Sequence, residues 1–185
     1  MQELSLYILD ITQNSLRAGA TQIDIKVEVC SEKNSLTITI TDNGKGMGAT
    51  ALALATDPFY TTRSRRRIGL GLPLFAMSAE MTGGSLVVES TLGIGTKVSA
   101  DYGLCHVDRL PMGDLAATVI AILQSGQCGL ILCYKVNEAE FYFDSREASW
   151  GEGLIDPLKP RALAYLYRYI RENIHNCNKA HPFYY

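Results

Sequence analysis

The stretch "DNGKGM" at residues 42 to 47 places a carboxylate and two glycines at the end of an alternating segment, "SLTITITD". A buried carboxylate without donors costs several kcal/mol, so Asp42 needs hydrogen-bond donors, and the exocyclic amine of a base would serve. Gly44 and Gly46 let the backbone lie against a flat ligand, because they have no side chains. The alternative interpretation is a turn aspartate that precedes a "DNG" hairpin. The first interpretation predicts a pocket for a base.

A second polar group lies on the segment "LSLYILDITQNSLR", residues 4 to 17, whose apolar residues recur at helical spacing. Asp10, Asn14 and Arg17 stand at i, i+4 and i+7, which places them on one face of that helix. An asparagine with a carboxylate four residues earlier can hold Mg²⁺ and orient a water, because Mg²⁺ binds through oxygen and keeps several waters. The alternative is an ordinary solvated helix face.

A third group is "GLGL" at Gly69 to Leu72, just before a helix that we expect to begin at Pro73. Gly69 and Gly71 at the start of a helix present free backbone N–H groups and the positive end of the helix dipole to phosphates. A base pocket, a magnesium-binding line and a phosphate loop together indicate a purine nucleotide site. The run "TTRSRRR" before it either contacts phosphates or an acidic protein, or is simply solvated.

The elements that position these groups follow from the hydrophobic periodicity. Period two along Leu36, Ile38 and Ile40 continues to Asp42, so the carboxylate is expected to point toward the interior. The expected elements are a helix at 4–17, strands at 23–29 and 36–42, a short helix at 49–55, a loop at 57–73, a helix at 73–81, and strands at 85–90 and 96–102. This order predicts an α+β, two-layer sandwich with helices on one face of a mixed, mostly antiparallel sheet.

The character of the chain changes after residue 102. An irregular link is followed by an expected helix at 115–123, a β-hairpin of 128–136 and 138–144, and a last helix at 160–174. We predict a nucleotide-binding domain over 1–102 and a small C-terminal α/β extension over 103–185 of unassigned role. The apolar stripe of the last helix either closes the core or makes the seam of a homodimer; its residues are Leu163, Leu166, Tyr167 and Ile170.

Composition restricts the class of protein. The 185 residues are 47% hydrophobic and 19% charged, which suits one compact domain or one domain with a small addition. A net charge of -2 supplies no overall positive field, so we expect neither nucleic acid nor a membrane as partner. The chain shows no spanning segment and its first residues carry acids, so we expect a cytoplasmic protein. Five cysteines without a CxxC pair are expected to be reduced thiols.

Five motifs in order make the chain resemble the GHKL ATPases, the family of gyrase, the ninety-kilodalton heat-shock chaperones, histidine kinases and MutL, which share the Bergerat ATP-binding fold. "LDITQNSLRAGAT" resembles the N-box, "DNGKGM" the G1 box, "DPFYTTR" the F box, "GLGL" the G2 box and "GIGTKV" the G3 box. The wording of the F and G2 boxes is most similar to the histidine kinase branch, and "NSLRAGAT" is also similar to MutL.

The resemblance implies ATP and Mg²⁺ as ligands and gives each motif a role. Asp42 would bind the adenine amino group, with Thr96 nearby through water, and Asn14 would ligate Mg²⁺. Arg17 would reach a phosphate, and Gly69 and Gly71 would cradle the phosphates. The ATP-binding residues implied are Asn14, Arg17, Asp42, Gly44, Gly46, Met47, Thr61, Thr62, Gly69, Leu70, Gly71, Leu72 and Thr96.

Two departures from the family pattern shape the functional hypothesis. Asp10 stands where hydrolytic members place a catalytic glutamate, so hydrolysis is expected to be slow or to need closure. His106, His175 and His181 have no phosphoacceptor context, so we do not expect a self-phosphorylating histidine kinase. We predict a regulatory protein kinase of signal transduction that acts on a separate protein. The alternatives are an ATP-driven switch with slow ATPase activity and a nucleotide-dependent interaction module.

Overall fold

The computed structural model describes residues 2–55, 71–125, 128–147 and 160–179. Its elements follow in the order expected from the periodicity. They are α1 (Leu4–Arg17), β1 (Gln22–Cys30), β2 (Ser35–Asp42), α2 (Ala49–Ala53), α3 (Gly71–Glu80), β3 (Ser85–Thr91), β4 (Gly95–Gly103), α4 (Leu115–Leu123), β5 (Gly129–Val136), β6 (Ala139–Asp144) and α5 (Pro160–Lys179). The expected loop over 57–73 lies mostly outside the described residues.

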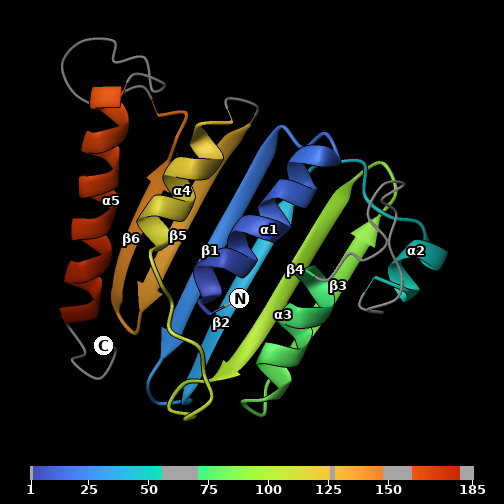
Figure 1. Ribbon diagram of the computed structural model, residues 1–185, viewed down its shortest axis with the longest axis horizontal. Coiled ribbons are helices and arrows are strands. Elements are labelled where there is room, and N and C mark those ends of the chain that lie inside the picture. The colour runs from blue at the N-terminus through green and yellow to red at the C-terminus, as the bar shows by residue number, and fades with distance from the viewer. Residues whose placement is uncertain (1, 56–70, 126–127, 148–159, 180–185) are drawn as a thin grey trace.

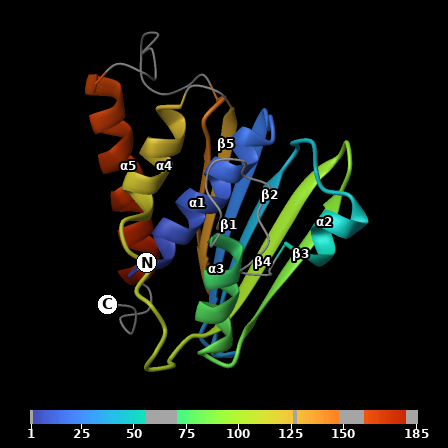
Figure 2. The same cartoon turned by 45° about the vertical axis from the view of Figure 1, so that its right-hand side comes forward.

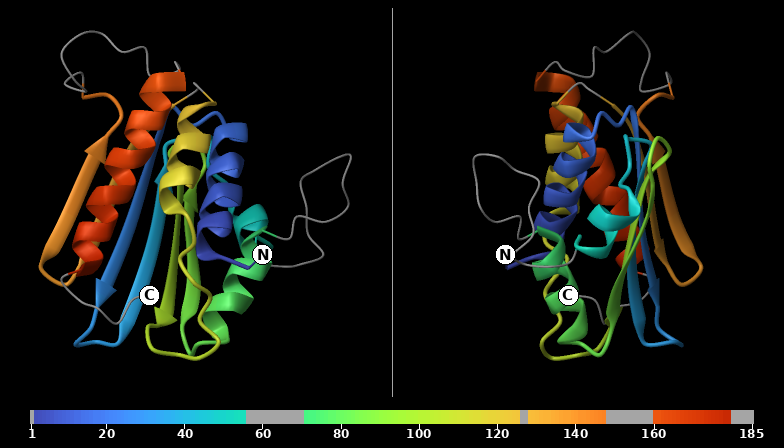
Figure 3. Two further views of the ribbon diagram at one scale, coloured as in Figure 1. Left: turned by 60° about the vertical axis from the view of Figure 1, so that its left-hand side comes forward. Right: turned by 90° about the vertical axis from the view of Figure 1, so that its right-hand side faces the viewer.

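The strands form one six-stranded sheet in the order β3-β4-β2-β1-β5-β6. β1 pairs with β5 in parallel, and the other neighbouring strands pair antiparallel. Helices α1, α3, α4 and α5 lie on one face of this sheet, as Figure 1 and the edge-on view in Figure 3 show. The structure therefore confirms the predicted α+β sandwich with a mixed, mostly antiparallel sheet.

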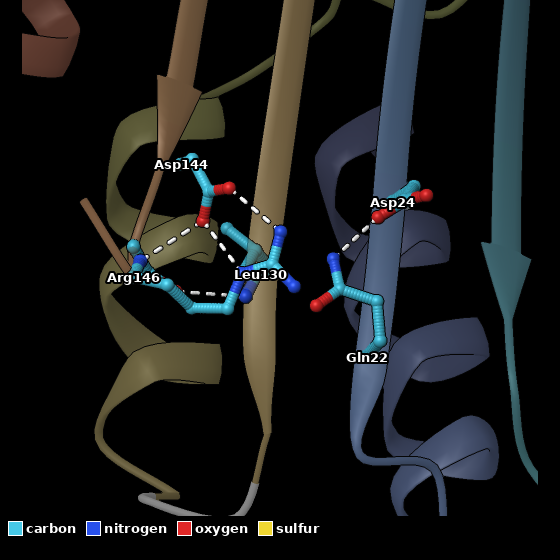
Figure 4. Close-up of polar contacts among 6 residues, drawn as sticks. Gln22, Asp24, Leu130, Asp144 and Arg146 are labelled. Atoms are coloured by element: carbon cyan, nitrogen blue, oxygen red, sulfur yellow. Dashed lines mark hydrogen bonds and ion pairs between the residues drawn. The ribbon is translucent and has the colours of Figure 1, made fainter.

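Alternation along the strands determines which face the helices cover. In β1, Ile23, Ile25 and Val27 are buried beneath the helices, whereas the residues between them are partly or fully exposed. In β2 the same alternation brings Ile40 and then Asp42 to the helix-covered side. The opposite face carries many polar side chains, with exposed Val87 and Tyr142 among them. Figure 4 looks onto this face and shows Gln22, Asp24, Asp144 and Arg146 in front of the strands, with helices behind.

The C-terminal part of the chain continues the same sheet. β5 pairs with β1 from Gln22↔Gly129 to Val29↔Val136, and β6 forms the outer edge. Helices α4 and α5 cover this half of the sheet, as Figure 2 shows. The last helix closes the core with part of its apolar stripe, because Leu166 and Ile170 are buried. The division of the chain at residue 102 stays a prediction.

Some helix boundaries differ from the expected ones; α2 ends at Ala53 and not at residue 55. α3 begins at Gly71, two residues before Pro73, which is compatible with proline because the first turn has no intrahelical acceptors for its N–H groups. α5 continues past residue 174 to Lys179. Its last turn is held by tertiary contacts, since Cys177 is buried and Asn178 Oδ1 accepts a hydrogen bond from the Tyr134 hydroxyl at 2.9 Å. None of the described helices combines the length and apolar character needed to cross a membrane.

Candidate functional site

A cavity of about 510 Å³ lies between α1, the ends of β2 and β4, and the start of α3. This volume falls in the range of about 300–1,000 Å³ that is usual for small-ligand pockets. The cavity brings together residues from the N-terminal helix, the segment after β2, and the helix that follows "GLGL". Its lining contains Asp10, Asn14, Ser15, Arg17, Asp42, Lys45, Gly46, Met47, Gly71, Leu72, Leu92 and Thr96.

Asp42 is the polar group on the strand side of the cavity. It is the last residue of β2 and stands opposite Thr96 of β4 in the sheet register. Its Oδ2 accepts a hydrogen bond from Ser15 Oγ at 2.6 Å, and its Oδ1 accepts one from the backbone N–H of Gly44 at 2.8 Å. Two donors from different segments therefore hold the carboxylate in place. Because an ionised carboxylate offers about four acceptor positions, Asp42 can still accept a hydrogen bond from an amine of a ligand.

Ser15 is a site residue that the sequence motifs did not single out. It follows Asn14 on α1, but it lies on the buried side of the helix, where only 3% of its surface is exposed. Its hydroxyl lies within hydrogen-bond distance of both Asp42 Oδ2 and the carbonyl oxygen of Ile11, which is 3.3 Å away. A hydroxyl at a buried helix position needs a partner, and this requirement was the signal available in the sequence.

Ser90 is a second site residue that the sequence motifs did not single out. It contacts both Met47 and Thr96, which the resemblance to the GHKL ATPases implies as ATP-binding residues. Its Oγ accepts a hydrogen bond from the Met47 backbone N–H at 2.8 Å and donates to the Gly95 carbonyl at 2.9 Å. Thr96 Oγ1 lies 2.9 Å from the same oxygen. Met47 and Thr96 are thereby held on the β3–β4 side of the cavity.

The segment after β2 packs against the β3–β4 turn. The backbone N–H of Gly93 donates to the Lys45 carbonyl at 2.7 Å. Gly46 has a φ of +63°, and a Cβ atom there would collide with the carbonyl oxygen of Thr91. The lack of a side chain at Gly46 therefore allows the end of β3 to pack against the backbone of Gly46, and it also leaves the cavity open.

The polar side chains of Asp10 and Asn14 on α1 face the beginning of α3. A Cβ atom on Gly71 would collide with Asp10 Oδ2 and would lie 3.9 Å from Asn14 Nδ2. Only a glycine fits this contact without a shift of the Asp10 carboxylate. The first residue of α3 thus brings the positive end of that helix close to the two oxygen-bearing side chains of α1.

Arg17 lies on the same face of α1 and is hydrogen-bonded to Asn14. Its Nη1 donates to Asn14 Oδ1 at 2.9 Å, and its Nη2 donates to Gln13 Oε1 at 3.4 Å. Asn14 Oδ1 is the amide atom that can coordinate a hard cation, so a Mg²⁺ ion on Asn14 would repel the guanidinium that contacts the same oxygen.

The donor chemistry at this end of the cavity fits Mg²⁺. Asp10 and Asn14 offer oxygen ligands, and Mg²⁺ is usually held by one or two protein groups together with substrate phosphates and waters. No cluster of three or more His, Cys, Asp or Glu side chains suited to a metal occurs in the part of the chain that the structure describes. Asn14 would hold the ion through its amide oxygen, with Asp10 beside it, and water and phosphate would complete the shell of the ion.

Several predicted site residues lie outside the described residues. They are Thr61, Thr62, Gly69 and Leu70, together with the arginines of "TTRSRRR". Gly44 is described and contacts Asp42 without lining the cavity. The roles assigned to all of the site residues stay predictions.

Comparison with known families agrees with this geometry. Residues 2–104 match the family model described as "Histidine kinase-, DNA gyrase B-, and HSP90-like ATPase". The chain belongs to this family. The match covers all of the described cavity-lining residues, so the cavity lies within an ATPase domain of the GHKL type.

A solved structure titled "Crystal Structure of N terminal domain of a DNA repair protein" matches with a TM-score of 0.53 and 13% sequence identity. The match covers 78% of this chain and 52% of that one, so this chain spans about half of the length of that structure. At this identity the likeness supports the fold alone. No curated protein sequence matches the chain.

Proposed function

We propose that this GHKL ATPase-family chain binds Mg·ATP in the cavity beside α1 and transfers the γ-phosphoryl group to a separate protein. One observation carries the proposal: Asp42 and the group Asp10, Asn14 and Gly71 line a single cavity of about 510 Å³. A carboxylate suited to a base amine and oxygen ligands suited to a magnesium ion are thus present in one ligand-sized space.

Each residue has a physical task in this proposal. Asp42, oriented by Ser15 and Gly44, accepts a hydrogen bond from the exocyclic amine of adenine. Asn14 offers its amide oxygen to Mg²⁺, which neutralises phosphate charge when it is bound. Arg17 exchanges Asn14 Oδ1 for a phosphate oxygen, because a guanidinium binds an anion more strongly than a neutral amide.

In the transfer step, a nucleophilic oxygen or nitrogen of the acceptor protein forms a bond to the γ-phosphorus. The bond between that phosphorus and the β,γ-bridging oxygen breaks, and ADP leaves with the electron pair. Asp10 would receive the proton of the acceptor, and the position of its carboxylate beside Gly71 and Asn14 supports this role. The products are ADP and a phosphorylated protein.

The position of the described histidines supports an acceptor on another molecule. His106 and His175 are exposed, and neither belongs to the lining of the cavity. Arg17 and Lys45 line the cavity and are exposed, so this side is accessible to a protein surface. Such a kinase would act in the cytoplasm, where its nucleotide is available.

Slow ATP hydrolysis that drives a conformational switch is a second candidate, and the position of Asp10 favours it. Asp10 lies one helical turn before Asn14 and against the start of α3. A carboxylate at this place can accept a proton from an attacking water as well as from a protein acceptor.

A single experiment with γ-labelled Mg·ATP separates these functions. We would follow free phosphate and label on protein for the wild type, Asp42→Asn and Asp10→Asn, first with the purified chain and then with its own cell extract. Label on an extract protein that requires Asp42 supports the kinase. Free phosphate that Asp10→Asn abolishes supports the ATPase switch.

Binding measurements on the same variants complete the test. Asp42→Asn is expected to weaken ATP binding, whereas Asp10→Asn is expected to retain it. Tight binding that yields neither product would indicate a nucleotide-dependent interaction module. Equal unfolding temperatures with and without Mg·ATP would rule out nucleotide binding itself, because a ligand of the native state must stabilise it.

A further inference from the structure

A second cavity, unrelated to the nucleotide site, runs between α4 and α5 on the helix-covered side of the molecule. Its volume is about 530 Å³, and the two helices that form it lie side by side in Figures 1 and 2. Its walls are almost entirely apolar, with Ala117, Ile120 and Ala121 from α4 and Leu163, Ala164 and Tyr167 from α5. The two helices thus leave a groove between them.

The groove has a fixed base. Asp114 caps α4 by accepting the Ala117 backbone N–H at 2.8 Å, and its other oxygen accepts the Tyr167 hydroxyl at 2.8 Å. Leu166 and Ile170 attach α5 to the core beneath. Because the two walls are joined at Asp114 and anchored below, the groove is preformed in the absence of a partner.

Positive charge lies along the α5 side of the groove. Arg168 lines the groove, and Arg161 and Arg171 are exposed one or two turns away on the same helix. Arg171 lies 5.8 Å from the centre of the Tyr167 ring. The other wall, α4, contains no charged residue. Two carboxylates lie near these arginines: Glu172 on α5, one turn after Arg168, and Asp114 at the base of the groove. The three arginines outnumber these carboxylates, so positive charge prevails beside the groove although the chain has a net charge of -2.

We propose that this groove docks an acidic amphipathic helix of a partner protein. Both walls are helices whose backbone groups are paired internally, so they offer nothing to an extended peptide that needs backbone partners. A helix satisfies its own backbone and can lay an apolar face into the groove. Ala117, Ala121 and Ala164 have small side chains that allow close approach, and carboxylates beside the apolar face would meet Arg161, Arg168 and Arg171.

A second copy of this chain does not fit the groove equally well. Its own exposed amphipathic helix, α5, carries the same arginines, so docking α5 on α5 would bring like charges together. A small molecule is also a poor occupant, because the open groove offers few polar groups to orient it. Apolar walls beneath the arginines distinguish the groove from a purely electrostatic surface for RNA or anionic lipid.

The test uses the full chain and a designed acidic amphipathic peptide about as long as α5, with leucine and alanine on one face and glutamate on both flanks. Fluorescence anisotropy of the labelled peptide is expected to show saturable binding that weakens as salt rises. A peptide of the same composition with scrambled periodicity, and one with lysine for glutamate, are expected not to bind.

Variants of the chain locate the binding to the groove. Ala121→Trp fills the groove and is expected to abolish binding, and Arg168→Glu is expected to weaken it about tenfold. Lys33→Glu, a reversal of charge on the exposed β1–β2 turn, is the matched control and should change little. Mg·ATP affinity should be the same in all three variants, which shows that the fold and the nucleotide site are intact.

Three outcomes would overturn the proposal. They are absence of saturable binding by the acidic helix, equal binding of the lysine peptide, and binding that Ala121→Trp leaves unchanged. If an RNA oligomer or anionic vesicles bound more strongly than the acidic peptide, and this binding required Arg168, the arginines would serve to bind RNA or anionic lipid instead. None of these results depends on whether the chain hydrolyses or transfers phosphate.

Discussion

Ser15 donates its hydroxyl hydrogen to Asp42 Oδ2 at 2.6 Å and so connects α1 to the end of β2 across 27 residues of sequence. The adjacent residue Asn14 belongs to the polar line that faces α3. One dipeptide of α1 therefore contacts both ends of the cavity. Its serine orients the carboxylate proposed to bind the base, and its asparagine faces the end proposed to bind phosphates.

The Ser15 contact predicts a specific loss of nucleotide affinity. Ser15→Ala removes one of the two donors that hold Asp42, so we expect ATP and adenosine to bind more weakly by about 1 kcal/mol, or roughly fivefold. Isothermal titration calorimetry measures both affinities. Thr12→Val is the matched control, since Thr12 is buried on the same helix and bonds the Leu9 carbonyl instead. Equal losses in the two variants would show that Ser15 acts only through the stability of α1.

Arg17 predicts a different pattern, because its proposed ligand is a phosphate and not the base. Arg17→Ala is expected to weaken ATP binding about tenfold at low salt while leaving adenosine binding unchanged. The ratio of the two affinities, measured at increasing salt, should approach that of the wild type as charges are screened. Arg168→Ala removes an exposed arginine of α5 and serves as the control. A proportional loss of adenosine affinity would contradict the phosphate role.

Gly46 predicts a loss of stability that its neighbour Gly48 does not share. Gly46→Ala places a side chain at a φ of +63° and into the Thr91 carbonyl oxygen. We expect a loss of about 2 kcal/mol and a fall in unfolding temperature of about 4–8 °C, measured by calorimetry. Gly48 has a φ of -77° and no atom within 4 Å of an added Cβ, so Gly48→Ala should be nearly neutral.

Local periodicity predicts much of this fold and one side of the site. Alternation along β2 puts Asp42 on the inner face, and helical spacing puts Asp10, Asn14 and Arg17 on one line; both follow from repeats within a single element. The order of helices and strands then limits the architecture to a two-layer sandwich.

Hydrophobic periodicity does not predict the contacts between elements that are far apart in the sequence. Period two shows that residues 129–136 form a strand, but it does not reveal that this strand pairs with β1 in parallel. The same holds for Ser15 and Ser90, whose partners come from other segments. Gly71 appeared in the sequence as a phosphate-binding glycine, whereas the structure also shows the close approach of its backbone to Asp10.

Asp144 and Arg146 predict a pH dependence of stability at the edge of the sheet (Figure 4). Arg146 Nη2 lies 2.7 Å from Asp144 Oδ2, and the guanidinium lowers the pKa of this carboxyl below its ordinary value of 3.8. Because the folded-state pKa is the lower one, the pair stabilises the fold fully above pH 3.8, and this stabilisation is lost as pH falls through the folded-state pKa.

Arg146→Gln is therefore expected to lower the free energy of unfolding at neutral pH, with a difference from the wild type that shrinks as the pH falls below 3.8 in urea titrations. Arg109→Gln is the control, since the Arg109 guanidinium donates to the backbone carbonyls of Leu104 and Leu110. Its effect should not follow the titration of a carboxylate. A deficit of Arg146→Gln that stays constant between neutral and acid pH would mean that Arg146 stabilises the edge by packing and not by its charge.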